Sequence, residues 1–105
     1  MKSDLELIND KNFWVRLNVA KRISIEHLPR MMNDENYYVR CEVAERIDPN
    51  HLPKMMNDKD YSVRLQVSKR IDPKFLGEMF GFDFDPEYQK ELIKVLAERE
   101  DLRRV

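Results

Sequence analysis

The sequence is poor in glycine and cysteine and contains no long apolar run. With 2 glycines in 105 residues, it has no glycine-rich loop of the kind that holds a phosphate. Its 1 cysteine, Cys41, excludes an internal disulfide and a zinc or iron–sulfur site built from four cysteines of one chain. The chain starts with acidic residues where a signal peptide is apolar, and no apolar run approaches the roughly 20 residues of a membrane span. We therefore expect a cytoplasmic protein without a transmembrane segment.

The chain also lacks an excess of either charge. Its 19 basic and 20 acidic residues give a formal net charge of −1, so no overall field attracts it to nucleic acid or to an anionic membrane. A hydrophobic content of 42% is sufficient for a modest core. We expect a single domain over residues 1–105, in which an electrostatic partner meets a local patch.

A 24-residue repeat dominates the sequence. The segment HLPRMMND at residues 27–34 returns one period later as HLPKMMND at residues 51–58. Stepping back by the same interval recovers a more diverged first unit. The period predicts units at residues 3–26, 27–50 and 51–74, followed by a degenerate capping repeat and a C-terminal helix within residues 75–105.

Each unit is predicted to contain two helices. In the second unit Asp34 is placed to cap a helix from about Glu35 to Ile47, and Asp10 and Asp58 are predicted to be the equivalent caps. The apolar stripes of the three main helices are Val15, Val19 and Ile23; Val39, Val43 and Ile47; Val63, Val67 and Ile71. The second helix of a unit is short and contains an internal proline, so we expect it to be partly 3₁₀. Because only stacked units bury these stripes, the pattern predicts an all-α fold, a short α-solenoid.

The pattern Met-Met-Asn-Asp-x-x-x-x-Val-Arg-x-x-Val-Ala-x-Arg-Ile resembles the leucine-rich repeat variant, over residues 3–74. The resemblance implies units that pair a 3₁₀ helix with an α-helix in a right-handed superhelix. The unit is also similar to a shortened HEAT repeat, because Asp34 and Arg40 stand six residues apart. This chain has Met where the family usually has Leu, and it lacks the cysteine-rich iron–sulfur segment of the founding member. Electron transfer is therefore not implied.

Two columns of arginine follow the period: Arg16, Arg40 and Arg64, and then Arg22, Arg46 and Arg70. Stacked guanidinium groups of the first column could bind successive phosphates. However, each of these arginines also has an aspartate in its own unit and one in the next, so we expect an internal Arg–Asp ladder. The second column lies one residue before each core isoleucine, where a long side chain keeps its head in water. It is the freer column, and we treat it as a candidate partner-binding site.

No catalytic or metal site is predicted. His27 and His51 stand at equivalent positions, but two histidines without a third ligand are too few for zinc. Cys41 stands where the neighbouring units have leucine, which indicates a core residue rather than a nucleophile. The polar residues mostly follow the period, so we expect neither an enzyme nor a cofactor.

Aromatic residues that break the period are the remaining candidates for partner binding. Trp14 and Tyr38 lie on the helix side away from the valine stripe, where large aromatic residues often carry interface energy. Packing of both side chains on a neighbouring turn is the alternative. Phe82 and Phe84 lie in a segment that alternates Phe with Gly and Asp, which cannot form one face of a helix.

We expect the phenylalanines to fold back and seal the last repeat, with an exposed Phe patch as the alternative. A final helix is predicted from Pro86 to Arg103, and its cap residues are Leu92, Ile93, Val95 and Leu96.

The sequence thus favours a non-enzymatic module that binds a protein partner through an exposed helix face. Nucleic-acid binding through the arginine columns is the alternative. It predicts affinity that falls steeply with salt.

Overall fold

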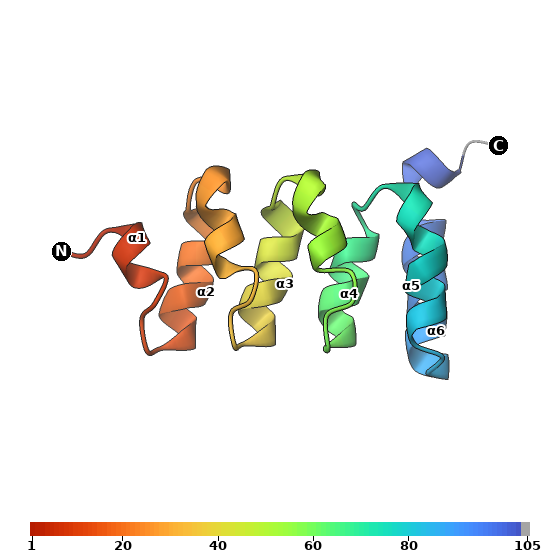
Figure 1. The fold of residues 1–105 in the computed structure, drawn as a ribbon, viewed down its shortest axis with the longest axis horizontal. Coiled ribbons are helices and arrows are strands. Elements are labelled where there is room, and N and C mark those ends of the chain that lie inside the picture. The colour runs from red at the N-terminus through yellow and green to blue at the C-terminus, as the bar shows by residue number, and fades with distance from the viewer. Residues whose placement is uncertain (104–105) are drawn as a thin grey trace.

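The computed structural model describes residues 1–103, and every regular element in this range is helical (Figure 1). The predicted all-α class is therefore confirmed. Residues 104–105, the end of the predicted segment 75–105, lie outside the described residues. The molecule is elongated, with principal extents of 51 × 27 × 19 Å. Within residues 1–103, no helix is both long and apolar enough to cross a membrane.

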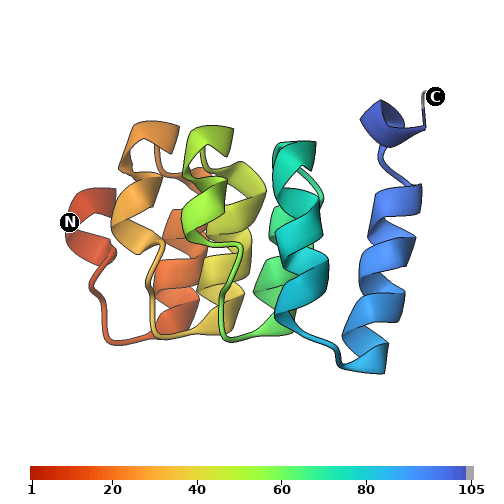
Figure 2. The same ribbon diagram turned by 45° about the vertical axis from the view of Figure 1, so that its right-hand side comes forward.

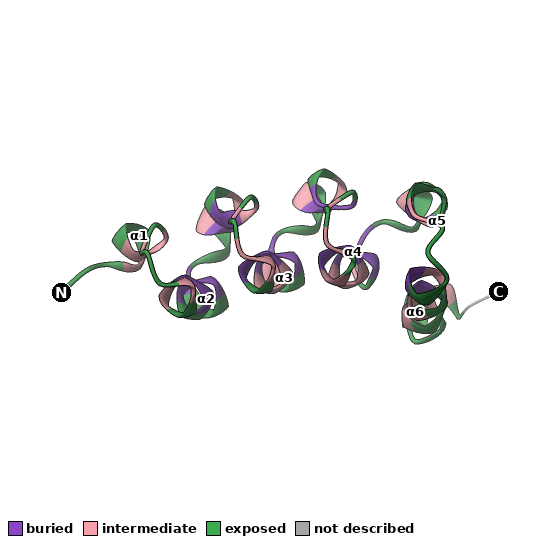
Figure 3. Cartoon of the chain, turned by 90° about the horizontal axis from the view of Figure 1, so that it is seen from below, coloured by how far each residue is buried: buried purple, intermediate pink, exposed green. Residues whose placement is uncertain are grey.

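The elements form two parallel rows, which are seen end-on in Figure 3. One row contains α2 (Phe13–Arg22), α3 (Tyr37–Arg46), α4 (Tyr61–Ser68) and α6 (Pro86–Ala97). The other row contains the short elements α1 (Asp4–Leu7), η1 (Ile25–Met31), η2 (Pro49–Lys54), η3 (Pro73–Phe75) and α5 (Leu76–Phe82). A 3₁₀ turn, η4 (Glu100–Leu102), ends the described chain. The helices α2, α3 and α4 begin at Phe13, Tyr37 and Tyr61, one predicted period apart.

The main helices begin two residues later than the sequence predicted. The caps are Asn12, Asn36 and Asp60, whose side chains accept the backbone N–H two residues on. Asp34 instead accepts the N–H of Asn36 at 2.9 Å and shapes the turn before the helix. Asp10 and Asp58 accept the N–H groups of Asn12 and Asp60 in the same way. The predicted caps were wrong because an aspartate carboxylate accepts the backbone N–H groups of a turn as readily as those of a helix N-terminus.

The second element of each full unit is a 3₁₀ helix. Both η1 and η2 contain an internal proline, Pro29 or Pro53, which has no N–H to donate. Short 3₁₀ segments tolerate this loss better than a long α-helix does. Asp48 and Asp72 cap η2 and η3, each accepting the N–H two residues on.

The core lies between the two rows. Every residue of the predicted stripes is buried except Val15, which is half-buried on the first unit. Small residues stand at a second buried position of each main helix, namely Ala20, Ala44 and Ser68, all with 0% exposure. These follow Arg16, Arg40 and Arg64 by one helical turn. Small side chains there allow neighbouring helices to pack closely.

The C-terminal segment differs from the expectation in three respects. The helix α5 (Leu76–Phe82) of the predicted capping repeat extends into the segment that alternates Phe with Gly and Asp. The final helix α6 ends at Ala97 and not at Arg103. Phe82 and Phe84 do not seal the last repeat, and both are exposed.

The residues that close the core are Tyr88 and Leu92, each with 0% exposure, whereas Ile93 is exposed. Tyr88 is long enough to reach the carbonyl of Met79 with its hydroxyl, at 3.4 Å. An aromatic ring with a polar tip therefore fills the position for which Phe82 and Phe84 were expected, and only Phe80 of this segment packs, half-buried, against the core.

Candidate functional site

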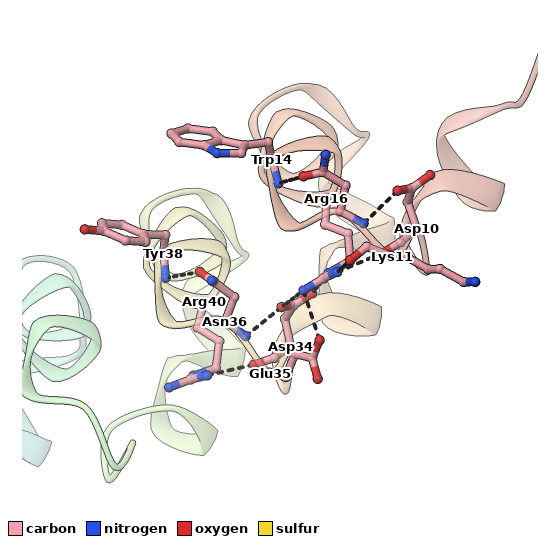
Figure 4. Close-up of polar contacts among 10 residues, drawn as sticks. Asp10, Lys11, Trp14, Arg16, Asp34, Glu35, Asn36, Tyr38 and Arg40 are labelled. Carbon is pink, nitrogen blue, oxygen red and sulfur yellow. Dashed lines mark hydrogen bonds and ion pairs between the residues drawn. The ribbon is translucent and has the colours of Figure 1, made fainter.

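The first arginine column is an internal ladder, as predicted. The Nε of Arg16 donates to Asp34 at 2.8 Å, and its Nη1 donates to the carbonyl of Asp10 at 2.7 Å (Figure 4). Arg40 makes the same contacts to Asp58 and to the carbonyl of Asp34, at 2.8 and 2.7 Å. Both arginine side chains are buried. This column therefore joins adjacent units and does not present free guanidinium groups to a phosphate.

The ladder continues into the last unit with a shift of one residue. Arg64 donates to the carbonyl of Asp58 at 2.6 Å and to the carboxylate of Asp83. Only one nitrogen of Arg64 reaches Asp83, and its buried Nε has no hydrogen-bond partner among the described residues. The guanidinium instead lies over the rings of Tyr88 and Phe82, at 4.5 and 5.2 Å from their centroids.

Gln89 ends the ladder. Its Nε2 donates to the carbonyl of Asp83 at 2.6 Å, which is equivalent to the bond that Arg64 makes to Asp58. The single NH₂ group of an amide cannot bind a further unit as well, whereas the several N–H groups of a guanidinium can. This equivalence shows that α6 is offset from α4 by one residue more than the period. With the same offset, Asp85 stands at the cap position that Asp60 has in α4.

The second arginine column binds the ends of the preceding helices. Arg46 donates to the carbonyls of Ala20 and Ile23 at 2.6 and 2.8 Å. Arg70 makes the equivalent bonds to Ala44 and Ile47, both at 2.8 Å. The last carbonyls of an α-helix have no partner within the helix, so these guanidinium groups cap it.

The two ends of this second column depart from the repeat. Arg22 has no preceding main helix to cap within the described chain, and it pairs with Asp4 at 2.8 Å on the surface. Arg99 caps α4 through the carbonyls of Ser68 and Ile71, at 3.0 and 2.8 Å. Sequence reasoning missed Arg99 because it lies off the period counted from Arg70. Its contacts to the carbonyls of α4 are the only signal of its role.

Trp14 and Tyr38 lie side by side on adjacent helices and project away from the protein. Figure 4 shows both rings pointing to the side opposite Arg16 and Arg40. Their exposed fractions are 60% and 53%. Each stacks on the preceding aromatic residue, with centroid distances of 5.0 Å to Phe13 and 4.2 Å to Tyr37. Each ring is thus packed against its aromatic neighbour on one side and exposed to solvent on the other.

All exposed aromatic residues of the described chain lie at one edge of the molecule. Figures 1 and 2 show that α2, α3, α4 and α6 begin at this edge, where α5 ends. The residues are Trp14, Tyr38, Tyr61, Phe82 and Phe84. Phe84 is the most exposed of them, at 78%. Sequence reasoning missed Tyr61 because tyrosine at this position follows the repeat.

We define the outer face as the two rows of exposed or half-buried residues that start at this edge. We call the first row the aromatic row after its first two members; it contains Trp14, Tyr38, Ser62 and Glu87. The polar row lies one helical turn further on and contains Asn18, Glu42, Gln66 and Glu91. The two rows contain three carboxylates and no lysine or arginine. Burial, and after it the charge of Glu45, raises the pKa of Glu42. The charges of Lys21 and Arg46 act in the opposite direction and lower the pKa of Glu42.

The histidines and Cys41 are the other groups that the sequence singled out. His27 lies 3.4 Å from Glu26, a neighbour in sequence. No group of three or more His, Cys, Asp or Glu side chains within residues 1–103 is placed to hold a metal ion. Cys41 is half-buried against the core, and burial raises the pKa of its thiol to about 11. A thiol with this pKa is protonated at neutral pH and is a poor nucleophile.

Comparison with known proteins identifies one kind of relative. No protein-family model matches the chain. No curated protein matches it either. A solved structure described as a leucine-rich repeat variant with a novel repetitive protein structural motif is similar, with a TM-score of 0.78 and 36% sequence identity. The match covers 91% of this chain and 39% of that chain, so this chain spans well under half of that protein. The resemblance predicted from the repeat pattern is confirmed.

Proposed function

We propose that this chain, which has the repeat fold of the leucine-rich repeat variant, is a non-enzymatic module that binds a protein partner. The module is a single domain of residues 1–105, a right-handed solenoid of 24-residue units that acts in the cytoplasm. It binds through the outer face of its main helices. A repeat fold supports this kind of function because each unit adds binding surface without needing a catalytic centre.

The position of Trp14 and Tyr38 supports the proposal most strongly. Both rings are more than half exposed, and both are fixed by a stacked aromatic neighbour. Rings that are already ordered lose little conformational entropy when a partner covers them. Exposure of two such rings to water is unfavourable. A partner that covers them removes this apolar surface from water, so the rings can anchor an interface.

Phe82 and Phe84 extend the proposed binding surface at the C-terminal end of the same edge. Phe84 has no ring partner in the described structure, while Phe82 lies under Arg64. Arg22, Arg46 and Arg70 remain predicted contacts, but their guanidinium groups already bind Asp4 or helix carbonyls. They therefore support the surface and contribute less to contact with the partner.

Nucleic-acid binding through the arginine columns is less well supported by the geometry. Arg16, Arg40 and Arg64 are buried and bound to aspartate, and the outer face contains no cation. Nucleic-acid binding requires several free cations near the phosphates. A measurement of DNA and RNA affinity at low salt tests this alternative directly, and strong binding that falls with salt would support it.

Protein capture tests the proposed function. The chain, immobilised through its N-terminus, is expected to retain a partner from lysate, and the double variant Trp14→Ala, Tyr38→Ala is expected to lose it. Ile25→Ala is the matched control, because Ile25 is also an exposed apolar residue but lies on the row of short helices. Retention of the partner by the double variant, at unchanged helical circular dichroism, contradicts the proposal.

A further inference from the structure

We infer that the N-terminal end of the solenoid is a second interaction surface, and that its partner is the last unit of another helical-repeat chain of the same class. We define the end face by three residues at this end, Asp10, Val15 and Arg22. In Figure 3, α2 is the first helix of its row, so no main helix of the described chain covers the end face. The inference does not depend on the outer face, and the residues of the two surfaces are different.

Each junction between successive units of the described chain consists of the same two halves. The preceding unit supplies an arginine and two carbonyls, and the following unit supplies an aspartate and a second arginine. At the first junction, Asp34 accepts from Arg16 at 2.8 Å. At the same junction, Arg46 donates to the carbonyls of Ala20 and Ile23 at 2.6 and 2.8 Å. The next two junctions repeat the set, with Arg40, Asp58 and Arg70, and then with Arg64, Asp83 and Arg99.

The end face has the following half of a junction without its complement. Asp10 and Arg22 stand one period before Asp34 and Arg46. The carboxylate of Asp10 accepts the N–H of Asn12 at 2.8 Å, but no arginine or lysine within residues 1–103 pairs with it. The side chain of Arg22 is 52% exposed and binds no helix carbonyl in the same part of the chain, whereas Arg46 binds two. The end face thus offers one negative and one positive group at the spacing that a preceding unit would match.

Packing at the end face indicates the same kind of partner. Val15 is half-buried, whereas its equivalents Val39 and Val63 are 0% exposed. The two later valines belong to helices that pack against the main helix of a preceding unit. The terminal unit of a repeat array usually has a polar outer side, and an apolar residue stands here instead. Another main helix over the end face would complete the burial of Val15.

The junctions specify the helix that fits the end face. It must supply an arginine for Asp10, a small residue one turn later, and free carbonyls at its C-terminal end for Arg22, as α2, α3 and α4 do for the units that follow them. The C-terminal end of this chain does not meet these conditions. Gln89 stands in the place of the arginine, and Ile93, which is 59% exposed, stands in the place of Ser68. A second copy stacked head to tail is therefore excluded, and the partner is a repeat unit with the pattern Arg-x-x-x-Ala or Arg-x-x-x-Ser.

Asp4 binds Arg22 in the free chain. Its carboxylate accepts from the Nε and Nη2 of Arg22 at 3.0 and 2.8 Å, and the side chains of Arg22 and Asp4 are 52% and 36% exposed. An ion pair this exposed contributes little stability. Arg22 can therefore exchange Asp4 for the carbonyls of a docked helix, as Arg46 binds those of α2. The two aspartates of this end then have opposite effects, because Asp10 binds the partner and Asp4 competes with it.

A titration followed by NMR tests the inference. The probe is a synthetic peptide of residues 49–72, a single unit that contains Arg64 and Ser68 and no cysteine. It is added to the full chain labelled with nitrogen-15. We expect the amide signals of Asp10, Val15 and Arg22 to shift, and those of α6 to stay in place. The matched control is the same peptide with Arg64→Gln, which should bind at least about tenfold more weakly because Asp10 then gains no cation.

Three variants of the chain locate the contact. Asp10→Asn keeps the turn, since an amide oxygen also accepts the N–H of Asn12, but it should weaken binding of the natural peptide at least about tenfold. It should not weaken the Arg64→Gln peptide further, because both changes remove the same ion pair. Asp4→Asn should strengthen binding, by up to about threefold. Tyr38→Ala, on the outer face, should leave binding unchanged, and circular dichroism confirms that each variant is folded.

Signals that shift on another surface, or no shifts at all, overturn the inference. Equal weakening by Asp10→Asn and Asp4→Asn also overturns it, because the peptide then responds only to negative charge in general. Sedimentation that shows the chain alone as a dimer, which Asp10→Asn dissociates, identifies a second copy as the occupant and overturns the inferred partner. None of these outcomes affects capture of a protein through Trp14 and Tyr38, so the proposed function is tested separately.

Discussion

Arg40 and Asp58 lie 18 residues apart in the sequence and form a two-pronged ion pair between adjacent units. The Nε and Nη2 atoms of Arg40 lie 2.8 and 3.1 Å from the two carboxylate oxygens of Asp58. Both side chains are 10% exposed or less. The pair therefore joins two units in a region that water scarcely reaches, where the geometry of a guanidinium–carboxylate contact is most specific.

Breaking this pair is predicted to destabilise the whole domain. Arg40→Ala leaves the buried carboxylate of Asp58 without its cation, and we expect a loss of about 3–5 kcal/mol in the free energy of unfolding. Urea denaturation measured by circular dichroism gives the value. The exposed pair Arg22–Asp4 is the internal control, with a coupling of about 0–1 kcal/mol in a double-mutant cycle. A loss for Arg40→Ala no larger than for Arg22→Ala contradicts the prediction.

Tyr88, and not the phenylalanines, is predicted to hold the C-terminal end of the core. Its side chain is fully buried between α4 and α6 and lies under Arg64. Tyr88→Ala should cost about 3–5 kcal/mol, since it leaves a large cavity. Phe84→Ala should change the free energy of unfolding by no more than about 0.5 kcal/mol, because Phe84 is exposed. Equal effects of the two changes in thermal or urea denaturation contradict the structure.

Cys41 is predicted to react slowly in the folded protein. Burial raises the pKa of its thiol from 9.0 to about 11, so the thiolate is scarce at pH 8. Labelling with a thiol reagent at pH 8 should be roughly 100-fold slower than in denaturant, the factor that two pKa units give. Because the pKa of Cys41 is higher in the folded state, its protonated thiol favours folding. This contribution to the free energy of unfolding is complete below about pH 9 and is lost as the pH rises towards 11. Equal labelling rates with and without denaturant contradict this prediction.

Glu42 is predicted to lower the stability of the free protein at neutral pH. Its pKa is raised in the folded state, first by burial and then by the charge of Glu45. Folding therefore favours the protonated carboxyl, and the stability that this gives at low pH is lost as the pH rises through the folded-state pKa. Glu42→Gln should increase the free energy of unfolding at pH 7 by a few tenths of a kcal/mol, up to about 0.5.

The comparison of urea denaturation between pH 4 and pH 7 checks this sign. The difference between Glu42→Gln and the natural chain should grow as the pH rises. A difference that shrinks over this range indicates that the ionised form is stabilised in the folded protein, for example by Lys21.

The sequence predicted the repeat fold and the ladder because both depend on spacing. Val39, Val43 and Ile47 recur at helical intervals, and they are buried as expected. The repeat places an aspartate of the next unit within the reach of each arginine, and the structure confirms the Arg16–Asp34 pair. A strict period gives every unit the same surroundings, so the interior units follow from the sequence with little tertiary information.

The candidate surface could be predicted only in part. Trp14 and Tyr38 were found from the helical face on which they lie, and their exposure agrees with the expectation. The place of Glu87 and Glu91 on the outer face was missed, because they join it only when α6 is placed in the same row as α4. That placement depends on the contacts of Gln89 and Arg64, which lie in two different units.

The sequence by itself thus determined the two-helix unit, its buried stripe and the arginine columns, since these require only local periodicity and a neighbour one period away. The tertiary structure decided which residues cap the helices, how the last unit closes and which face is open. These depend on competition between groups that the sequence leaves equally eligible. Asp34 could cap a helix or bind Arg16, and in the folded protein it binds the arginine because Asn36 takes the cap. Tyr88 could stay on the surface as Tyr38 does, and it is buried because α6 packs against α4 and its ring fills the space between them.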